Sequence, residues 1–308
     1  MKKINLGNSG LMASSISLGL MRMAGMQLGD AAKVLSAAVE SGIDFFDHAD
    51  IYGAGKSEEL FAQAAKEAGL KREDMLIQTK CGIRPSAELT TYDFSKEHIL
   101  NSVDKSLKRL DTDYVDVLLL HRPDTLMEPT EVAEAFAQLK SSGKVKYFGV
   151  SNFTPVQVEL LQRSIKDIKL IANQLQFGLM HATMVDRGVY ANRMESFAVD
   201  RTGDILEYSR LREMTIQAWS PFSSAQGIFV DNPAYPELNA YLTELANKYN
   251  VTPSAIATAW VLRHPAKIQT IIGTMTPSRI VDISKADDIT LTREEWYMLY
   301  KKAGVTLP

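Results

Sequence analysis

The stretch Tyr114–His121, with the sequence YVDVLLLH, decides the fold. The valine and leucine side chains of VDVLLL fall on both faces of a strand, which is typical of a parallel sheet covered by helices. Similar short β-rich runs recur along the chain, at Ile16–Leu20, Asp44–Asp47, Met75–Lys80, Lys146–Val150, Ile171–Gln174, Thr215–Trp219 and Thr270–Ile272. The sequence therefore predicts eight strands.

Segments with helical periodicity separate these runs. Residues 29–42 place Ala31, Val34 and Leu35 on one face and end at Gly42. Threonine followed by proline is a typical helix start. Further helices are expected at Ser95–Arg109, Thr130–Ser142 and Thr154–Ser164, and after Thr252–Pro253 and Thr276–Pro277. Repeated strand–helix units indicate an α/β protein with a parallel sheet, either doubly wound or closed. Eight units favour a closed (β/α)8 TIM barrel.

The chain is expected to form a single domain over residues 1–308, because no glycine-rich linker or low-complexity run divides it. Residues 2–14, KKINLGNSGLMAS, predict an N-terminal β-hairpin that turns at Asn8–Gly10. An extra helix is expected at the C-terminal end, followed by 304–308. Long connections at 84–94 and 221–238 are expected on the rim of the barrel, where functional residues often collect.

The composition is that of an average soluble protein, with 45% hydrophobic and 23% charged residues in 308. A net charge of −3 offers no basic excess for nucleic acid or an anionic membrane. Neither a signal-peptide pattern nor a membrane-length apolar run is found, so a cytoplasmic protein is expected. The single cysteine, Cys81, excludes an internal disulfide and predicts no metal cluster. No interface pattern decides the oligomeric state.

Four polar residues follow the apolar runs: Asp47 and Tyr52 in FFDHADIYG, Lys80 in MLIQTKCG and His121 in YVDVLLLHRPD. The active site of a (β/α)8 barrel lies at the carboxyl ends of its strands. Each residue alone has a commoner structural explanation, but four at successive strand ends favour catalysis. Lys80 would stabilise a tyrosinate, and Asp47 would balance the buried ammonium. With His121 bonding a substrate oxygen, the set suits protonation of a carbonyl group.

Reduction of a carbonyl group also needs a hydride, so a cofactor is implied. No G-x-G-x-x-G follows a strand, which disfavours a Rossmann site. Barrels bind phosphate after their seventh and eighth strands, here AWSPFSS at 218–224 and IIGTMTPSR at 271–279. The second loop offers Gly273, Thr274, Thr276 and Arg279. Arg279 can pair with a 2′-phosphate, which favours NADPH over NADH, although Thr276 and Arg279 would alone be read as a helix cap and a surface charge.

In this combination and order, the motifs resemble those of the aldo-keto reductases, which are nicotinamide-dependent (β/α)8 oxidoreductases, and in particular a bacterial branch with HADIYG and LLLHRPD. The resemblance covers essentially the whole chain and implies that Asp47, Tyr52, Lys80 and His121 are catalytic. It also implies a cofactor site. Ser151 and Asn152 of GVSNF and Gln174 of ANQLQF would hold the nicotinamide amide, Trp219 would stack on the ring, and Ser220 would contact phosphate. The expected cofactor site also includes Gly19, Met21, Asp47 and Pro221.

The chain departs from the family pattern at three positions. His48 replaces the usual threonine, and strand alternation predicts that it points away from Asp47 into the wall. Gly273 replaces a lysine that often contacts the 2′-phosphate, and Ile283 replaces an asparagine that often contacts adenine. NADPH is still expected because Arg279 and Thr274 remain. The short segment 304–308 predicts an open pocket, with substrate choice left to the rim segments 84–94 and 221–238 and to Met21 and Met180.

The main functional hypothesis is NADPH-dependent reduction of aldehydes or ketones to alcohols by hydride transfer, with Tyr52 as proton donor. The alternative is a cofactor-binding regulatory protein with little turnover. A third interpretation, a lyase or isomerase that uses Lys80 as a Schiff-base amine, leaves GVSNF, Gln174 and the phosphate loops unexplained.

Overall fold

A computed structural model of the chain describes residues 1–194, 196–201 and 203–306. Eight parallel strands form a closed barrel in sequence order. They are β3 (Ile16–Gly19), β4 (Phe45–Asp47), β5 (Leu76–Cys81), β8 (Val115–Leu120), β9 (Val145–Ser151), β10 (Leu170–Gln176), β11 (Thr215–Trp219) and β14 (Gln269–Ile272). The barrel closes where β14 pairs with β3, with Thr270 opposite Ile16. The predicted (β/α)8 barrel is confirmed.

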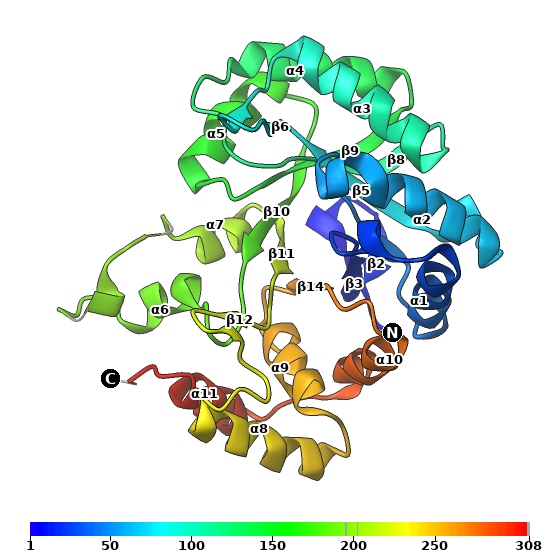
Figure 1. Cartoon of the computed structure of the whole chain (residues 1–308). Coiled ribbons are helices and arrows are strands. Elements are labelled where there is room, and N and C mark those ends of the chain that lie inside the picture. Colours follow the sequence, from blue (N-terminus) through cyan, green and yellow to red (C-terminus); the bar gives the residue numbers. More distant parts are fainter. Residues whose placement is uncertain (195, 202, 307–308) are drawn as a thin grey trace.

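Helices surround the strands, as Figure 1 shows. They are α1 (Leu28–Glu40), α2 (Lys56–Glu67), α3 (Lys96–Leu110), α4 (Pro129–Ser141), α5 (Pro155–Ile165), α6 (Thr183–Val189), α7 (Ile205–Leu211), α8 (Pro236–Tyr249), α9 (Pro253–Leu262), α10 (Pro277–Ser284) and α11 (Arg293–Lys302). Helices α1 and α10 contact each other, so the ring of helices closes where the ring of strands closes.

Helix starts follow the predicted capping signals with one exception. The side chains of Ser95, Thr154 and Thr252 each accept a hydrogen bond from the backbone N–H three residues further on. Thr276 holds the same position before α10, but its side chain forms no capping bond. Its own N–H instead donates to the hydroxyl of Thr274 at 3.3 Å. The loop before α10 is therefore shaped by its own side chains rather than by a helix cap.

The predicted hairpin closes the amino-terminal end of the barrel. Strands β1 (Lys3–Asn5) and β2 (Met12–Ser14) pair antiparallel. Leu6 joins an inner apolar cluster with Phe45, Val117 and other barrel residues. Gly7 is required here: its φ is +58°, and a Cβ would lie 2.5 Å from the backbone of Ile171. At the other end of the chain, the extra helix α11 packs against α8.

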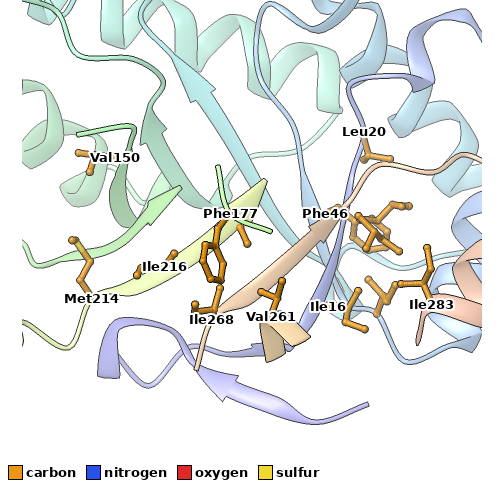
Figure 2. Packing of buried hydrophobic residues seen from close by; sticks show 14 of the residues in the cluster. Ile16, Leu20, Phe46, Val150, Phe177, Met214, Ile216, Val261, Ile268 and Ile283 are labelled. Carbon is orange, nitrogen blue, oxygen red and sulfur yellow. The ribbon is translucent and has the colours of Figure 1, made fainter. Parts of the chain in front are cut away.

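Strand β8 shows why the run VDVLLL is apolar on both faces. All six of its residues are buried. Val117 and Leu119 belong to the cluster inside the barrel, whereas Leu118 and Leu120 belong to the larger cluster between strands and helices. Figure 2 shows part of this larger cluster, contributed by strands and helices from distant parts of the sequence. The barrel is thus a rigid frame for the residues at its carboxyl end.

Candidate active site

The four predicted catalytic residues meet at the carboxyl end of neighbouring strands. Asp47 ends β4, Lys80 lies near the end of β5, and His121 directly follows β8. Tyr52 begins a short 3-10 turn, Tyr52–Gly55, between β4 and α2. The backbone N–H of Asp50 bonds to the carbonyl of Lys80 at 3.0 Å, which holds this connection against β5. The side chain of Tyr52 is therefore placed by two strands.

The ammonium of Lys80 is fully buried, and all three of its protons form hydrogen bonds. Its Nζ donates to Asp47 Oδ2 at 2.9 Å, to the carbonyl oxygen of His48 at 2.7 Å and to Tyr52 Oη at 3.0 Å. An ammonium has three protons, and each has an acceptor here. Burial alone would lower the pKa of Lys80, but the charge of Asp47 and the contact with Tyr52 outweigh it, so this pKa is raised. Lys80 is a cation at neutral pH.

The phenol of Tyr52 stays protonated at neutral pH. Burial raises its pKa, and the nearby charge of Lys80 only partly opposes this effect. Because Oη accepts the bond from Lys80, the phenol proton is left for another acceptor. The rings of Tyr52 and His121 lie edge to face, with 6.0 Å between their centroids. An oxygen atom bound between them could take this proton.

The imidazole of His121 is neutral. Burial, together with the charges of Lys80 and Arg122, lowers its pKa to about 2. Its Nδ1 is buried and has no hydrogen-bond partner among the residues that the structure describes. That leaves Nε2 as the nitrogen able to bond a molecule in the cavity, and the tautomer with the proton on Nε2 avoids a buried, unpaired N–H.

A cavity of about 910 Å³ opens above these residues. Asp47, Tyr52 and His121 line it, whereas Lys80 lies beneath. Its lining includes every residue predicted for cofactor binding, namely Gly19, Met21, Asp47, Ser151, Asn152, Gln174, Trp219, Ser220, Pro221, Gly273, Thr274, Thr276 and Arg279. Its size is within the range of small-molecule and cofactor sites.

Near the predicted catalytic residues, side chains from two strand ends, those of β9 and β11, form a connected wall. Asn152 has a φ of +61°, and its Nδ2 donates to the hydroxyl of Ser151 at 2.8 Å. The indole N–H of Trp219 donates to Asn152 Oδ1 at 3.3 Å. Ser220 also has a positive φ, +49°. Left-handed backbone at residues other than glycine is unfavourable and tends to occur at functional sites.

Two further arginines, Arg22 and Arg279, line the cavity. Arg279 is exposed there and forms no ion pair with the described residues. Gly273 has open space where a Cβ would lie. Arg22 donates from Nη1 to the carbonyl oxygen of Gly273 at 3.3 Å. This arginine was not predicted, although its place just after the first barrel strand is the signal from which the four catalytic residues were predicted.

Other sequence predictions fare differently. His48 is buried as expected, with its ring 4.5 Å from that of Phe61 in an edge-to-face contact. Burial and the charge of Lys80 lower its pKa to about 3. Met180 and 84–94 are not among the described residues that line the cavity. Met180 packs against the main core, and 84–94 overlaps the short hairpin of β6 (Ile83–Arg84) and β7 (Thr91–Tyr92). Their role in substrate choice stays a prediction.

The rim segment 221–238 does reach the cavity, as expected. It carries the short strands β12 (Ser223–Ser224) and β13 (Gly227–Ile228), and its lining residues include Phe222 and Val230. Arg122, which was not predicted, also lines the cavity and lies 5.7 Å from the ring of Trp219. Gln174 makes an unpredicted contact: its amide donates to Asp47 Oδ1 at 3.0 Å.

Comparison of the sequence with known proteins identifies the family. The family model described as the aldo/keto reductase family matches residues 15–303. The chain belongs to the aldo/keto reductase family. It is 35% identical over 317 residues to "Oxidoreductase YdhF" of Escherichia coli, covering 100% of this chain and 99% of that protein. It is 34% identical to "6-dehydroglucose reductase" of Agrobacterium fabrum, covering 87% and 86% of the two chains.

The same barrel is found in a solved aldo/keto reductase from Klebsiella pneumoniae in complex with NADP and acetate. Its TM-score is 0.78 at 23% identity, over 97% of this chain and 94% of that chain. This likeness concerns the fold. The family match and the relatives together make the chain an oxidoreductase of the aldo/keto reductase family. No helix among the described residues is long and apolar enough to cross a membrane.

Proposed function

We propose that this chain, acting as one domain over residues 1–308, reduces aldehydes or ketones to alcohols with NADPH. The observation that carries the proposal is the contact between Lys80 and Tyr52, 3.0 Å from Nζ to Oη, at the floor of a cofactor-sized cavity. The Agrobacterium relative is a 6-dehydroglucose reductase, and the reduction that its name states supports the same reaction class.

In this mechanism Tyr52 is the proton donor. NADPH supplies the hydride that reduces the carbonyl carbon. Tyr52 and the Nε2–H of His121 bond the carbonyl oxygen, and Tyr52 transfers its proton as negative charge develops there. The ammonium of Lys80, already bonded to Oη, then stabilises the tyrosinate. Asp47 keeps this ammonium in place.

The cavity lining fits NADPH. Ser151, Asn152 and Gln174 would bond the nicotinamide amide, and Trp219 would stack on its ring. At the other end, Thr274, Thr276 and the unpaired Arg279 would bind the 2′-phosphate. A Klebsiella protein with the same barrel holds NADP. NADH lacks this phosphate, and we expect it to be the poorer cofactor.

The Schiff-base interpretation does not fit Lys80. An amine must be neutral to attack a carbonyl group. The raised pKa of Lys80 keeps it charged, and its three protons bond Asp47, Tyr52 and the carbonyl of His48.

The test is an oxidation screen with NADPH and NADH against aldehydes and ketones, followed by Tyr52→Phe. Loss of the proton donor should reduce kcat by about 10²–10⁴-fold, with the NADPH Kd within about twofold. Full turnover in this variant would refute the mechanism. Tight NADPH binding without oxidation across the whole panel would instead support the regulatory alternative.

A further inference from the structure

Four glutamines fill the middle of the barrel: Gln78, Gln174, Gln217 and Gln269. Each is at most 3% exposed. The interior of such barrels is usually filled by branched apolar side chains, and a buried amide is unfavourable unless its hydrogen bonds are satisfied. These four residues therefore need a physical explanation that the barrel itself does not supply.

The amides form a continuous hydrogen-bonded chain. Gln269 Nε2 donates to the carbonyl oxygen of Ser14 at 2.8 Å, and Gln217 Nε2 donates to Gln269 Oε1 at 2.8 Å. Gln217 Oε1 in turn accepts from Gln78 at 3.0 Å and from Gln174 at 3.3 Å. These last two amides also donate to Asp47 Oδ1, at 2.6 Å and 3.0 Å respectively.

The orientation of every amide follows from the end of this chain. A backbone carbonyl such as that of Ser14 can only accept a hydrogen bond, so Gln269 must turn its NH₂ group toward it. The oxygen of Gln269 then faces Gln217, which must donate, and the oxygen of Gln217 faces the next amides. Gln78 consequently presents an N–H to Asp47. The hairpin at the opposite end of the barrel thus sets which groups reach the catalytic carboxylate.

We propose that Gln78 and Gln217 are positioning residues that fix the rotation of the Asp47 carboxylate, an inference that rests on the proposed reductase function. Gln78 makes the shorter of the two amide bonds to Oδ1, and the ammonium of Lys80 lies 2.8 Å from Oδ1 and 2.9 Å from Oδ2. Without such contacts the χ2 torsion of an aspartate, which sets the rotation of its carboxylate, has a broad distribution. Gln217 does not contact Asp47 but holds both amides that do.

Fixing Asp47 fixes the ammonium of Lys80 and, through it, the oxygen of Tyr52. If the carboxylate turns, the raised pKa of Lys80 should fall, because the charge of Asp47 is what sustains it against burial. The support for tyrosinate at Tyr52 should then weaken. If the four glutamines only filled space, replacing one of them by a side chain of equal volume would leave the pKa of Lys80 unchanged.

The central test is Gln78→Met, which keeps the volume and removes the donor. We expect kcat to fall about 10- to 100-fold, with the NADPH Kd within about twofold. The alkaline limb of the kcat profile that reports loss of the Lys80 proton should move to lower pH. A tyrosinate absorbance titration, taken as the difference from Tyr52→Phe, needs no substrate. It should show Tyr52 ionising at higher pH in Gln78→Met than in the wild type.

Gln217 provides an independent pair of variants. Gln217→Met should reproduce the Gln78→Met phenotype. Gln217→Glu should largely restore kcat, because a buried, protonated carboxyl can still donate to Gln269 and accept from the other amides. This rescue also covers the case in which Gln78→Met does not fold.

Thr79→Val is the matched control. Thr79 lies between Gln78 and Lys80 on the same strand and is 1% exposed, but its hydroxyl donates to Glu58 at 2.6 Å. It should lose stability without moving the kcat profile or the tyrosinate titration. Wild-type kinetics and titration in Gln78→Met and Gln217→Met would overturn the positioning role. Failure of the reductase proposal would show separately, as unchanged turnover in Tyr52→Phe.

Discussion

The ammonium of Lys80 donates to the phenol oxygen of Tyr52 across 3.0 Å, and not the reverse. The direction of this bond matters because an ammonium has no acceptor, and the single proton of the phenol is left free. Tyr52 can therefore give its proton to a molecule in the cavity, and the ammonium of Lys80 can stabilise the negative charge left on the phenol oxygen. This arrangement favours reduction of a carbonyl group over nucleophilic chemistry by Lys80.

Lys80→Met should reduce stability as well as activity. Removing one partner of a buried ion pair leaves the other uncompensated, and we expect about 3 kcal/mol less free energy of unfolding. The double variant Lys80→Met with Asp47→Asn should recover much of this loss. Urea denaturation of the single and double variants measures the coupling. Additive losses would contradict a tightly coupled pair.

Arg279→Ala should weaken NADPH binding and leave NADH binding almost unchanged, since only NADPH carries the 2′-phosphate. The loss of a charge-assisted contact should raise the NADPH Kd about tenfold or more. Fluorescence titration with both cofactors measures the difference. Arg293→Ala is the control, because this arginine is also exposed but lies outside the cavity lining. Equal effects of the two substitutions would exclude a specific role for Arg279.

Gly273→Lys should strengthen NADPH binding. Apart from its two chain neighbours, no described residue has a heavy atom within 4 Å of the position that a Cβ would take, so the new side chain has room. The added cation would stand beside Arg22, which already bonds the carbonyl of Gly273, and near Arg279. We expect the ratio of the NADH Kd to the NADPH Kd to rise several-fold. A ratio equal to that of the wild type would place the 2′-phosphate elsewhere.

Asp50→Asn should change how stability depends on pH. Burial, and then the charge of Glu58, raises the pKa of Asp50 to about 7, although Arg109 and Lys80 oppose the shift. An unfolded aspartate has a pKa near 4, so the native state binds this proton more tightly than the unfolded state does. The contribution of protonated Asp50 to the free energy of unfolding is therefore fully present below about pH 4 and lost as pH rises through about 7.

The free energy of unfolding of the variant should equal that of the wild type near pH 4 and exceed it by about 1–3 kcal/mol at pH 8. Thermal unfolding of both proteins between these pH values tests this prediction. Parallel curves for the two proteins would mean that Asp50 does not titrate in this range.

Much of the molecule could be predicted because its signals are local. The strand in VDVLLL is recognised from its own residues, and the caps at Ser95 and Thr154 involve a backbone group three residues away. That Met180 packs against the main core could not be predicted, because the direction of a loop side chain depends on packing that spacing does not reveal. Gln78 was overlooked although it stands two residues before Lys80, on the same face of its strand.

The sequence by itself determined the order of strands and helices and the presence of Asp47, Tyr52, Lys80 and His121 at strand ends, because hydrophobic periodicity and capping act over a few residues. Only the closed barrel decided what these residues touch. Gln78 reaches Gln217 across 139 positions, and Arg22 reaches Gly273 across 251. Which amide faces Asp47, and where the proton of Tyr52 points, depends on groups that the chain brings together only when β14 pairs with β3.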